Sequence, residues 1–164
     1  MGELPMKPLI NLNELSESQS SERGKYGETS YPVSELIGAR KLGYSLSVVP
    51  PGKRVCPFHH HRHNEEMFLM LEGEGTLRFG DQTYPLRPLD IIACPPGGAE
   101  VAHQIINSGS EDLIYLCLST NEPIDICGYP DSGKVLAMTG EQGNRTFRHM
   151  SRIRDEVDYY EGEE

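Results

Sequence analysis

Hydrophobic and polar residues alternate along the middle of the chain, and turn-forming residues interrupt the alternation at short intervals. In one clear example, Leu42, Tyr44, Leu46 and Val48 are separated by Gly or Ser before "PPGK" breaks the run. A period of two is typical of β-strands, because successive side chains point to opposite faces. Further strands are predicted at residues 67–71, 76–86 (a hairpin), 90–94, 103–106 and 112–119. Six or more short strands without a convincing long helix indicate an all-β sandwich or barrel.

Two pairs of these strands are expected to form hairpins. In "TLRFGDQTYPL" (76–86), Gly80 and Asp81 can adopt the positive φ angles of a tight turn. The strands at 103–106 and 112–119 are separated by the polar segment "NSGSE", which predicts a second hairpin.

The two ends of the chain lack this alternation. Residues 16–30 are polar and rich in Ser and Gly, so we expect a flexible arm, preceded by a short strand or helical turn in "PLINLNEL". Residues 145–164 have weak helical character in their middle and an acidic finish. The predicted organisation is an N-terminal arm over 1–35, a barrel core over 36–120 and a C-terminal extension over 121–164.

Composition limits the classes of partner. The 164 residues carry a net charge of -10, with scattered cations, which argues against nucleic acid or an anionic membrane surface as a partner. The longest apolar runs, such as "LIYLCL", are too short to cross a bilayer. We therefore expect a cytoplasmic protein of one domain, whose four cysteines are free thiols.

Four of the six histidines occupy five consecutive positions in the stretch "PFHHHRHNEEMFLMLEGEG". On a strand, His59, His61 and His63 face one way and His60 the other, so two imidazoles at i and i+2 can converge on one ion. Glu66 follows closely enough for a tight turn to bring its carboxylate alongside. Two alternatives are a zinc-protease-like helix, which the three prolines of "VVPPGKRVCPF" oppose, and a solvated histidine tract.

These residues resemble the two motifs of the cupin superfamily. The first, G-x5-H-x-H-x3/4-E-x6-G, is matched with one extra residue before the first histidine by Gly52, His59, His61, Glu66 and Gly73. The second, G-x5-P-x-G-x2-H-x3-N, is matched from its proline onwards by Pro96, Gly98, His103 and Asn107. Asp90 replaces the first glycine of the second motif, and four residues rather than two precede its histidine.

The resemblance implies a jelly-roll β-barrel of two antiparallel sheets with a metal ion in its mouth. The ligands implied by motif position are His59, His61, Glu66 and His103. Such a mixed nitrogen and oxygen set suits one divalent transition ion, and Zn, Mn, Fe, Ni and Co all remain open. An ion with open coordination positions can polarise a carbonyl or hydroxyl group or activate water.

A substrate pocket is expected next to this site. If Glu66 points inwards, then Phe68 and Met70 point inwards on the same strand, and Ile105 and Asn107 do so along the strand of His103. Plain barrel core is an equally good interpretation of these four residues. Polar groups that could reach the mouth are Tyr44, Arg54 and Arg78, and the nearest cations for a phosphate group are Lys53, Arg54 and Arg78.

Three functions are compatible with the resemblance. The first is a metal-dependent enzyme of the sugar-phosphate isomerase type, acting on a small polar metabolite. The second is an Fe(II)- or Ni(II)-dependent dioxygenase, and the third is a cupin that binds a small ligand without catalysis. The resemblance also implies a homodimer, with the N-terminal arm crossing to the partner because open sheet edges need cover.

Overall fold

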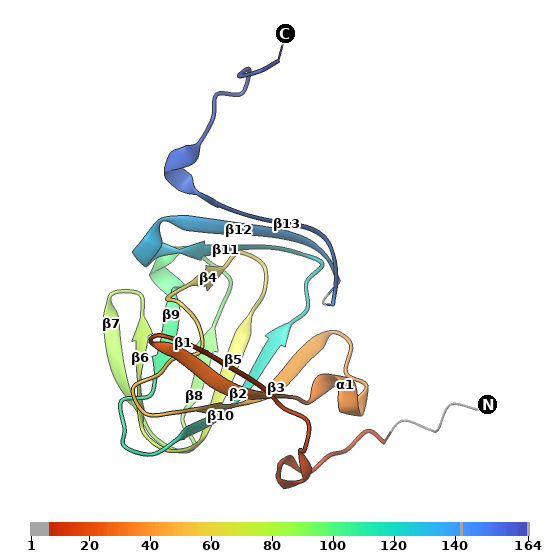
Figure 1. Ribbon diagram of the computed structural model, residues 1–164, viewed down its shortest axis with the longest axis vertical. Helices are drawn as coiled ribbons and strands as arrows, with labels where there is room; N and C mark the ends of the chain where they lie inside the picture. Colours follow the sequence, from red (N-terminus) through yellow and green to blue (C-terminus); the bar gives the residue numbers. More distant parts are fainter. Residues whose placement is uncertain (1–6, 142, 164) are drawn as a thin grey trace, which may run out of the picture.

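The computed structural model describes residues 7–141 and 143–163, and these residues form a two-layered antiparallel jelly roll (Figure 1). One layer is a sheet whose strands lie in the order β1 (Gln19–Arg23), β2 (Tyr26–Pro32), β3 (Leu42–Val49), β10 (Leu113–Thr120), β5 (Glu66–Glu72) and β8 (Ile91–Cys94). The described pairings between these strands are antiparallel. The all-β class and the jelly-roll architecture predicted from the sequence are confirmed.

The opposite layer consists of two smaller sheets joined at a histidine. The first has the order β7 (Gln82–Leu86), β6 (Gly75–Phe79) and β9 (His103–Ile106), and the second has the order β13 (Asn144–Arg152), β12 (Lys134–Glu141), β11 (Ile124–Tyr129) and β4 (His60–His61). His59 bridges them, because its N–H donates to the carbonyl of His103 at 3.1 Å and its carbonyl accepts from the N–H of His103 at 2.8 Å. The histidine segment is therefore held on both sides by backbone pairing.

Short helices precede, connect or follow the strands. The α-helix α1 (Ser34–Ile37) joins β2 to β3 and ends at Gly38, whose φ of 74° is readily adopted only by glycine. The 3-10 helices are η1 (Leu12–Glu14), η2 (Ala99–Val101), η3 (Pro130–Ser132) and η4 (Ile153–Asp155). Within the described residues, no helix is long and apolar enough to span a membrane.

The apolar core lies between the layers, towards one end of the strands. Its largest fully buried apolar side chains are Met70, Leu113 and Val49. Leu113 and Val49 are register partners on β10 and β3, and Met70 is the register partner of the buried Tyr115. These side chains share one face because partners across antiparallel strands point the same way.

Several local predictions are confirmed and others are wrong. The hairpin of β6 and β7 forms as expected, with Gly80 at a φ of 55°. No hairpin joins residues 103–106 to 112–119 in the described structure, because β9 pairs with β6 whereas β10 pairs with β3 and β5. The polar loop between β9 and β10 crosses from one layer to the other, which the polar composition of "NSGSE" permits but does not reveal.

The two ends of the chain are more regular than their composition suggests. Residues 19–30, expected to be flexible, form β1 and most of β2. β1 pairs with β2, and β2 pairs in turn with β3. Residues 144–152, expected to be weakly helical, form β13, which pairs with β12 over its length. In both segments long-range pairing determines the structure despite weak local signals. Residues 1–6 of the predicted arm and residue 164 lie outside the described residues, and the domain limits at 35 and 120 stay a prediction.

Candidate metal centre

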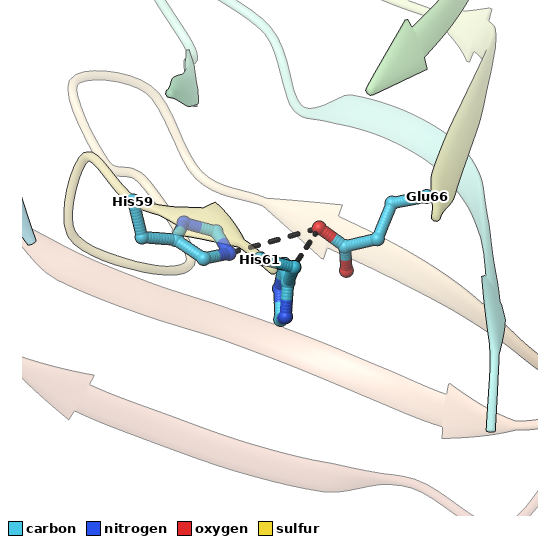
Figure 2. Close-up of side chains that lie close together, drawn as sticks. All are labelled: His59, His61 and Glu66. Carbon is cyan, nitrogen blue, oxygen red and sulfur yellow. Dashed lines mark ion pairs between the residues drawn. The ribbon is translucent and has the colours of Figure 1, made fainter. Parts of the chain in front are cut away.

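The four predicted ligands come from both layers of the jelly roll and meet between them. His59, His61 and His103 lie on the histidine-bearing segment and on β9, in the layer of smaller sheets. Glu66 is the first residue of β5 in the six-stranded sheet. Figure 2 shows the carboxylate of Glu66 pointing towards His59 and His61 from the facing strand.

One oxygen of Glu66 is the focus of the cluster. Its Oε2 atom lies 2.9 Å from Nε2 of His103, 3.3 Å from Nε2 of His61 and 3.7 Å from Nε2 of His59. The ring centroid of His59 lies 5.0 Å from that of His61 and 4.7 Å from that of His103. The ligand atoms of His59, His61 and Glu66 all lie within 4.8 Å of one another, and Nε2 of His103 lies against the same carboxylate oxygen, so four donor atoms gather at Glu66.

The other ring nitrogen of each histidine faces a hydrogen-bond acceptor. Nδ1 of His59 lies 2.9 Å from the carbonyl oxygen of Pro57, and Nδ1 of His103 lies 3.3 Å from that of Val101. Nδ1 of His61 lies 2.6 Å from Oδ2 of Asp125. A proton on each Nδ1 satisfies these acceptors and leaves the lone pair of each Nε2 directed at the common volume.

An unpartnered buried nitrogen indicates that the donor set fits a divalent transition ion. Nε2 of His61 is buried and has no hydrogen-bond partner among the described residues. A buried polar atom without a partner costs free energy, and here it points towards a carboxylate that two further imidazoles also face. Neutral imidazoles and a carboxylate are ligands that such ions accept, so His59, His61, Glu66 and His103 could hold one.

Without an ion, protons compensate the charge of this cluster. Burial opposes the charged form of His59, but hydrogen bonds with Cys56 and Glu66 outweigh it and raise the pKa of His59 to about 10. Burial likewise opposes the charge on His61, yet its hydrogen bond to Asp125 contributes most to raising its pKa to about 12. Burial would raise the pKa of Glu66, but the three imidazoles hold it well below the usual range. The pocket is thus built to contain positive charge next to Glu66.

Asp125 on β11 fixes the orientation of His61. It is fully buried, and besides His61 it accepts hydrogen bonds from the backbone N–H of His63 at 3.1 Å and of Ile126 at 2.9 Å. The side-chain amide of Asn64 donates to it at 2.8 Å. These donors and His61 hold the pKa of Asp125 below its usual range despite burial, so the group is a carboxylate at neutral pH. Sequence analysis did not single out Asp125.

Cys127 makes a second cluster with the same histidine. Its Sγ lies 3.2 Å from Nδ1 of His61, and Asp125 completes a group that could in principle hold a cation. The 2.6 Å separation between His61 and Asp125 is a hydrogen-bond distance. We therefore interpret this second group as support for His61, on the side of the ring away from Glu66.

The remaining histidines of the stretch have other surroundings. His63 is half-exposed, and its Nδ1 lies 3.9 Å from Asp125. His60 points to the opposite side from the cluster and packs against Gly128, its register partner on β11. A side chain at residue 128 would collide with the ring of His60, so glycine there allows β4 and β11 to pair.

Comparison with known proteins identifies the family. The Cupin domain family matches residues 45–119. Auxin-binding protein T92 of Nicotiana tabacum is 30% identical over 133 residues, which cover 76% of this chain and 70% of that protein. The chain belongs to the cupin superfamily. Auxin-binding protein 1 of Arabidopsis thaliana is also similar to this cupin, at 29% identity over 77% of this chain and 67% of that protein.

Solved structures with the same fold include two from bacteria. This cupin superimposes with a TM-score of 0.81 on a protein from Acidithiobacillus ferrooxidans whose name provisionally calls it a sugar phosphate isomerase. The two share 25% identity over 93% of this chain and 96% of that one. A protein named as a cupin sugar phosphate isomerase from Silicibacter pomeroyi gives a TM-score of 0.77 at 19% identity, over 94% and 98% of the two chains, which shows likeness of fold alone.

A cavity of about 730 Å³ lies against the six-stranded sheet of this cupin, and none of the four cluster residues is in its lining. Its lining includes Gly43, Ser45, Cys117 and Ser119, from β3 and β10. Ser119 is the register partner of Glu66, so the two side chains lie next to each other on the same face of the sheet. Further lining residues are mostly polar and include Gln19, Ser30, Ser34, Arg40, Lys41, Asn121 and Glu141.

Of the residues predicted for a substrate pocket, Tyr44 lines this cavity. Phe68, Met70 and Ile105 lie in the apolar core, with the ring of Phe68 5.8 Å from that of His103. Asn107 is fully buried and bonds to the backbone, since its amide donates to the carbonyls of Val49 at 2.7 Å and Glu111 at 2.8 Å. Phe68, Met70, Ile105 and Asn107 thus lie in the barrel core, which was the alternative interpretation of these four residues.

The three predicted cations lie outside the lining of the cavity. Arg78 forms a bidentate pair with Asp131, at 2.8 and 3.1 Å, and stacks on the ring of Phe58. Lys53 is bonded to Glu22 at 2.7 Å. Arg54 is held by backbone bridges to β2 and β9. The cavity lining instead contains Arg40 and Lys41, which sequence analysis passed over because they precede a strand in an unremarkable loop.

Proposed function

We propose that this cupin is a metal-dependent enzyme that isomerises a small phosphorylated sugar. The observation that carries the proposal is the convergence of three Nε2 atoms on Glu66 next to a polar, hydroxyl-lined cavity. The structural likeness to the Acidithiobacillus ferrooxidans protein supports the choice of substrate class. His59, His61, Glu66 and His103 would hold one divalent ion, with Zn, Mn, Fe, Ni and Co all compatible with the donor set.

The ion, when bound, would supply Lewis acidity towards a carbonyl or hydroxyl group of the substrate. The residues of the chain have separate tasks. Asp125 keeps His61 in the tautomer that directs Nε2 inwards. Serine hydroxyls of the cavity can bond to sugar hydroxyls. Glu35 and Glu141 place carboxylates in the lining, and a carboxylate is the type of group that transfers a proton between neighbouring sugar carbons.

The test is turnover of aldose and ketose phosphates by protein loaded separately with Zn(II), Mn(II), Fe(II), Ni(II) and Co(II). In deuterated water, an isomerase that works by proton transfer incorporates deuterium next to the carbonyl carbon, which NMR detects. We expect both interconversion and incorporation with at least one ion. If every metal-loaded form is inert towards the whole panel, the isomerase proposal is wrong.

A second candidate function is ligand binding without catalysis, favoured by the similarity to the two plant proteins named as auxin-binding. In that case the metal-loaded protein binds its ligand and returns it unchanged. The third function considered, a dioxygenase with an apolar pocket, has less support because Phe68, Met70 and Ile105 belong to the core and the cavity is polar. Retention of iron or nickel in natively purified protein would revive it.

We also propose that the chain forms a homodimer, and that the outer face of the C-terminal sheet contributes to the contact. Ile124 and Phe147 are each about half exposed and lie on one face, because both are in register with Thr139. Ile126 continues the same face. Light scattering tests this: a dimer is expected for the native chain and a monomer for Ile126→Glu, whereas a monomeric native chain removes the proposal. The cytoplasmic location expected from the sequence stays a prediction.

A further inference from the structure

The cavity contains two adjacent cations whose role the metal ligands do not explain. Arg40 and Lys41 line it, and both side chains are exposed to solvent at its rim. Neither forms an ion pair within 4.0 Å in the parts of the chain that the structure describes. The carboxylates of Glu35 and Glu141 also line the cavity, but neither is paired with these cations in the described structure. In a chain whose net charge is -10, two adjacent unpaired cations at the rim of a cavity offer a local site for an anion.

The backbone of this pair is fixed to the floor of the cavity. The carbonyl of Lys41 accepts a hydrogen bond from the N–H of Asn121 at 2.9 Å, and that of Arg40 accepts from the Asn121 side chain at 3.3 Å. Asn121 follows β10 directly after Thr120, two residues beyond Ser119. Since Ser119 is the neighbour of Glu66 across the sheet, one short segment connects the cations, the floor and the metal centre.

The lining between these two ends suits a polyol better than an apolar molecule. Ser30, Ser45 and Ser119 offer hydroxyls, and Gln19 and Asn121 offer amides. Ligand cavities of proteins commonly span roughly 300–1,000 Å³, and a cavity of about 730 Å³ has room for a sugar phosphate with water.

We infer that Arg40 and Lys41 form the subsite for the phosphate group of a phosphorylated sugar, whose other end extends over Ser119 towards Glu66. The inference rests on the proposed function for the orientation of the substrate, but its binding part can be measured separately. A guanidinium and an ammonium group can share the oxygens of a phosphate through charge-assisted hydrogen bonds. The two residues would then select phosphorylated over unphosphorylated sugars.

The experiment is calorimetric titration of Zn(II)-loaded protein with glucose 6-phosphate, glucose and phenylacetate. The variant is Arg40→Gln with Lys41→Gln. The matched control is Arg23→Gln with Lys25→Gln, which removes the same charge at the β1–β2 turn, outside the cavity lining. The rescue variant, Arg40→Lys with Lys41→Arg, keeps both charges.

We expect the native protein to bind glucose 6-phosphate more tightly than glucose or phenylacetate. The charge-removing variant should bind glucose 6-phosphate about 10- to 100-fold more weakly, the range that charged hydrogen bonds provide, with zinc content and glucose affinity unchanged. The control and rescue variants should bind like the native protein. Equal affinity of the charge-removing variant and the native protein for glucose 6-phosphate would overturn the subsite, as would tighter binding of phenylacetate.

The two proposals fail in different ways. Selective binding of glucose 6-phosphate that depends on Arg40 and Lys41, without turnover of any sugar phosphate, keeps the subsite and removes the isomerase. Turnover that is unaffected in the charge-removing variant keeps the isomerase and removes the subsite.

Discussion

Glu66 and Met70 lie on the same strand and the same face, yet their surroundings are opposite in character. Around Glu66, imidazoles and serines form a polar region with a cavity beside it. Around Met70, which is completely buried, apolar side chains from both layers pack without such an opening. The comparison indicates that one end of the strand stabilises the fold and the other end carries the chemistry. Changes at the two ends should therefore have separable effects.

The largest effect is expected from Glu66→Gln, which removes the charge on which three imidazoles converge. Loss of an outer-shell partner of a metal ligand typically costs about 10- to 100-fold in metal affinity, so loss of a direct ligand should exceed about 100-fold. Metal affinity can be measured by titration with Zn(II) against a competing chelator. Glu72→Gln, at the exposed far end of the same strand, is the control and should bind metal like the native protein.

Met70→Ala should have the converse effect. Truncating a fully buried methionine removes packing and leaves a cavity, which costs about 2–5 kcal/mol of unfolding free energy. Urea unfolding of metal-free protein measures the loss, and Ile91→Ala, at an exposed apolar position of β8, should change it by no more than about 0.5 kcal/mol. If folded Met70→Ala no longer binds metal, stability and metal binding do not depend on separate ends of β5.

Asp125→Asn tests whether metal binding at the Glu66 end of β5 depends on a residue of β11. An asparagine amide facing Nδ1 of His61 would donate to it, move the ring proton to Nε2 and direct an N–H at the metal. We expect metal affinity to fall by about 10- to 100-fold, less than for loss of a ligand. Asp131→Asn makes the same chemical change at an exposed position paired with Arg78, and it should leave metal affinity as it is. Native affinity in Asp125→Asn would show that Asp125 does not position His61.

The metal-free protein should also show a pH dependence of its stability. The raised pKa values of His59 and His61, about 10 and about 12, add stability below the ordinary histidine value near 6.5, and this stability is lost as pH rises through the folded values. Urea midpoints should therefore decrease from pH 7 to pH 10. Metal affinity should increase over the same range, because binding displaces these protons.

Replacing His149, an exposed histidine on β13, with Asn serves as the control for this dependence. The decrease in urea midpoint should persist in this variant and become smaller in His61→Asn. A midpoint that is constant between pH 7 and pH 10 in metal-free native protein contradicts the expected charge state of the cluster.

His59 and His61 were predictable as a converging pair because alternation along a strand is a local property. His59 and His61 alternate on one segment, and the resemblance to two separated motifs placed Glu66 and His103 with them. Asp125 was not predictable in this way. In "PIDIC" the pattern suggests buried isoleucines around an exposed acid, but the structure buries Asp125 and exposes Ile124 and Ile126. Apart from the adjacent N–H of Ile126, the groups that make this burial favourable come from residues 61, 63 and 64, far away in sequence.

The cavity was also beyond what alternation reveals. On β3 the apolar row of Tyr44, Leu46 and Val48 predicts the strand, whereas Ser45 and Ser47 are in register with Cys117 and Tyr115 on the inner face. A polar interior next to a metal centre reverses the usual relation between hydrophobicity and burial. The strand could therefore be found from the sequence, but its inner face could not.

The most direct test of this account is the metal stoichiometry of natively folded protein at neutral pH. Chelator-treated native protein, titrated with Zn(II) at pH 7.5 and analysed for bound metal, should take up one ion per chain. Glu66→Gln, folded under the same conditions, should take up none at comparable free Zn(II). A folded native protein that takes up no transition ion would contradict the central claim that His59, His61, Glu66 and His103 form a metal centre.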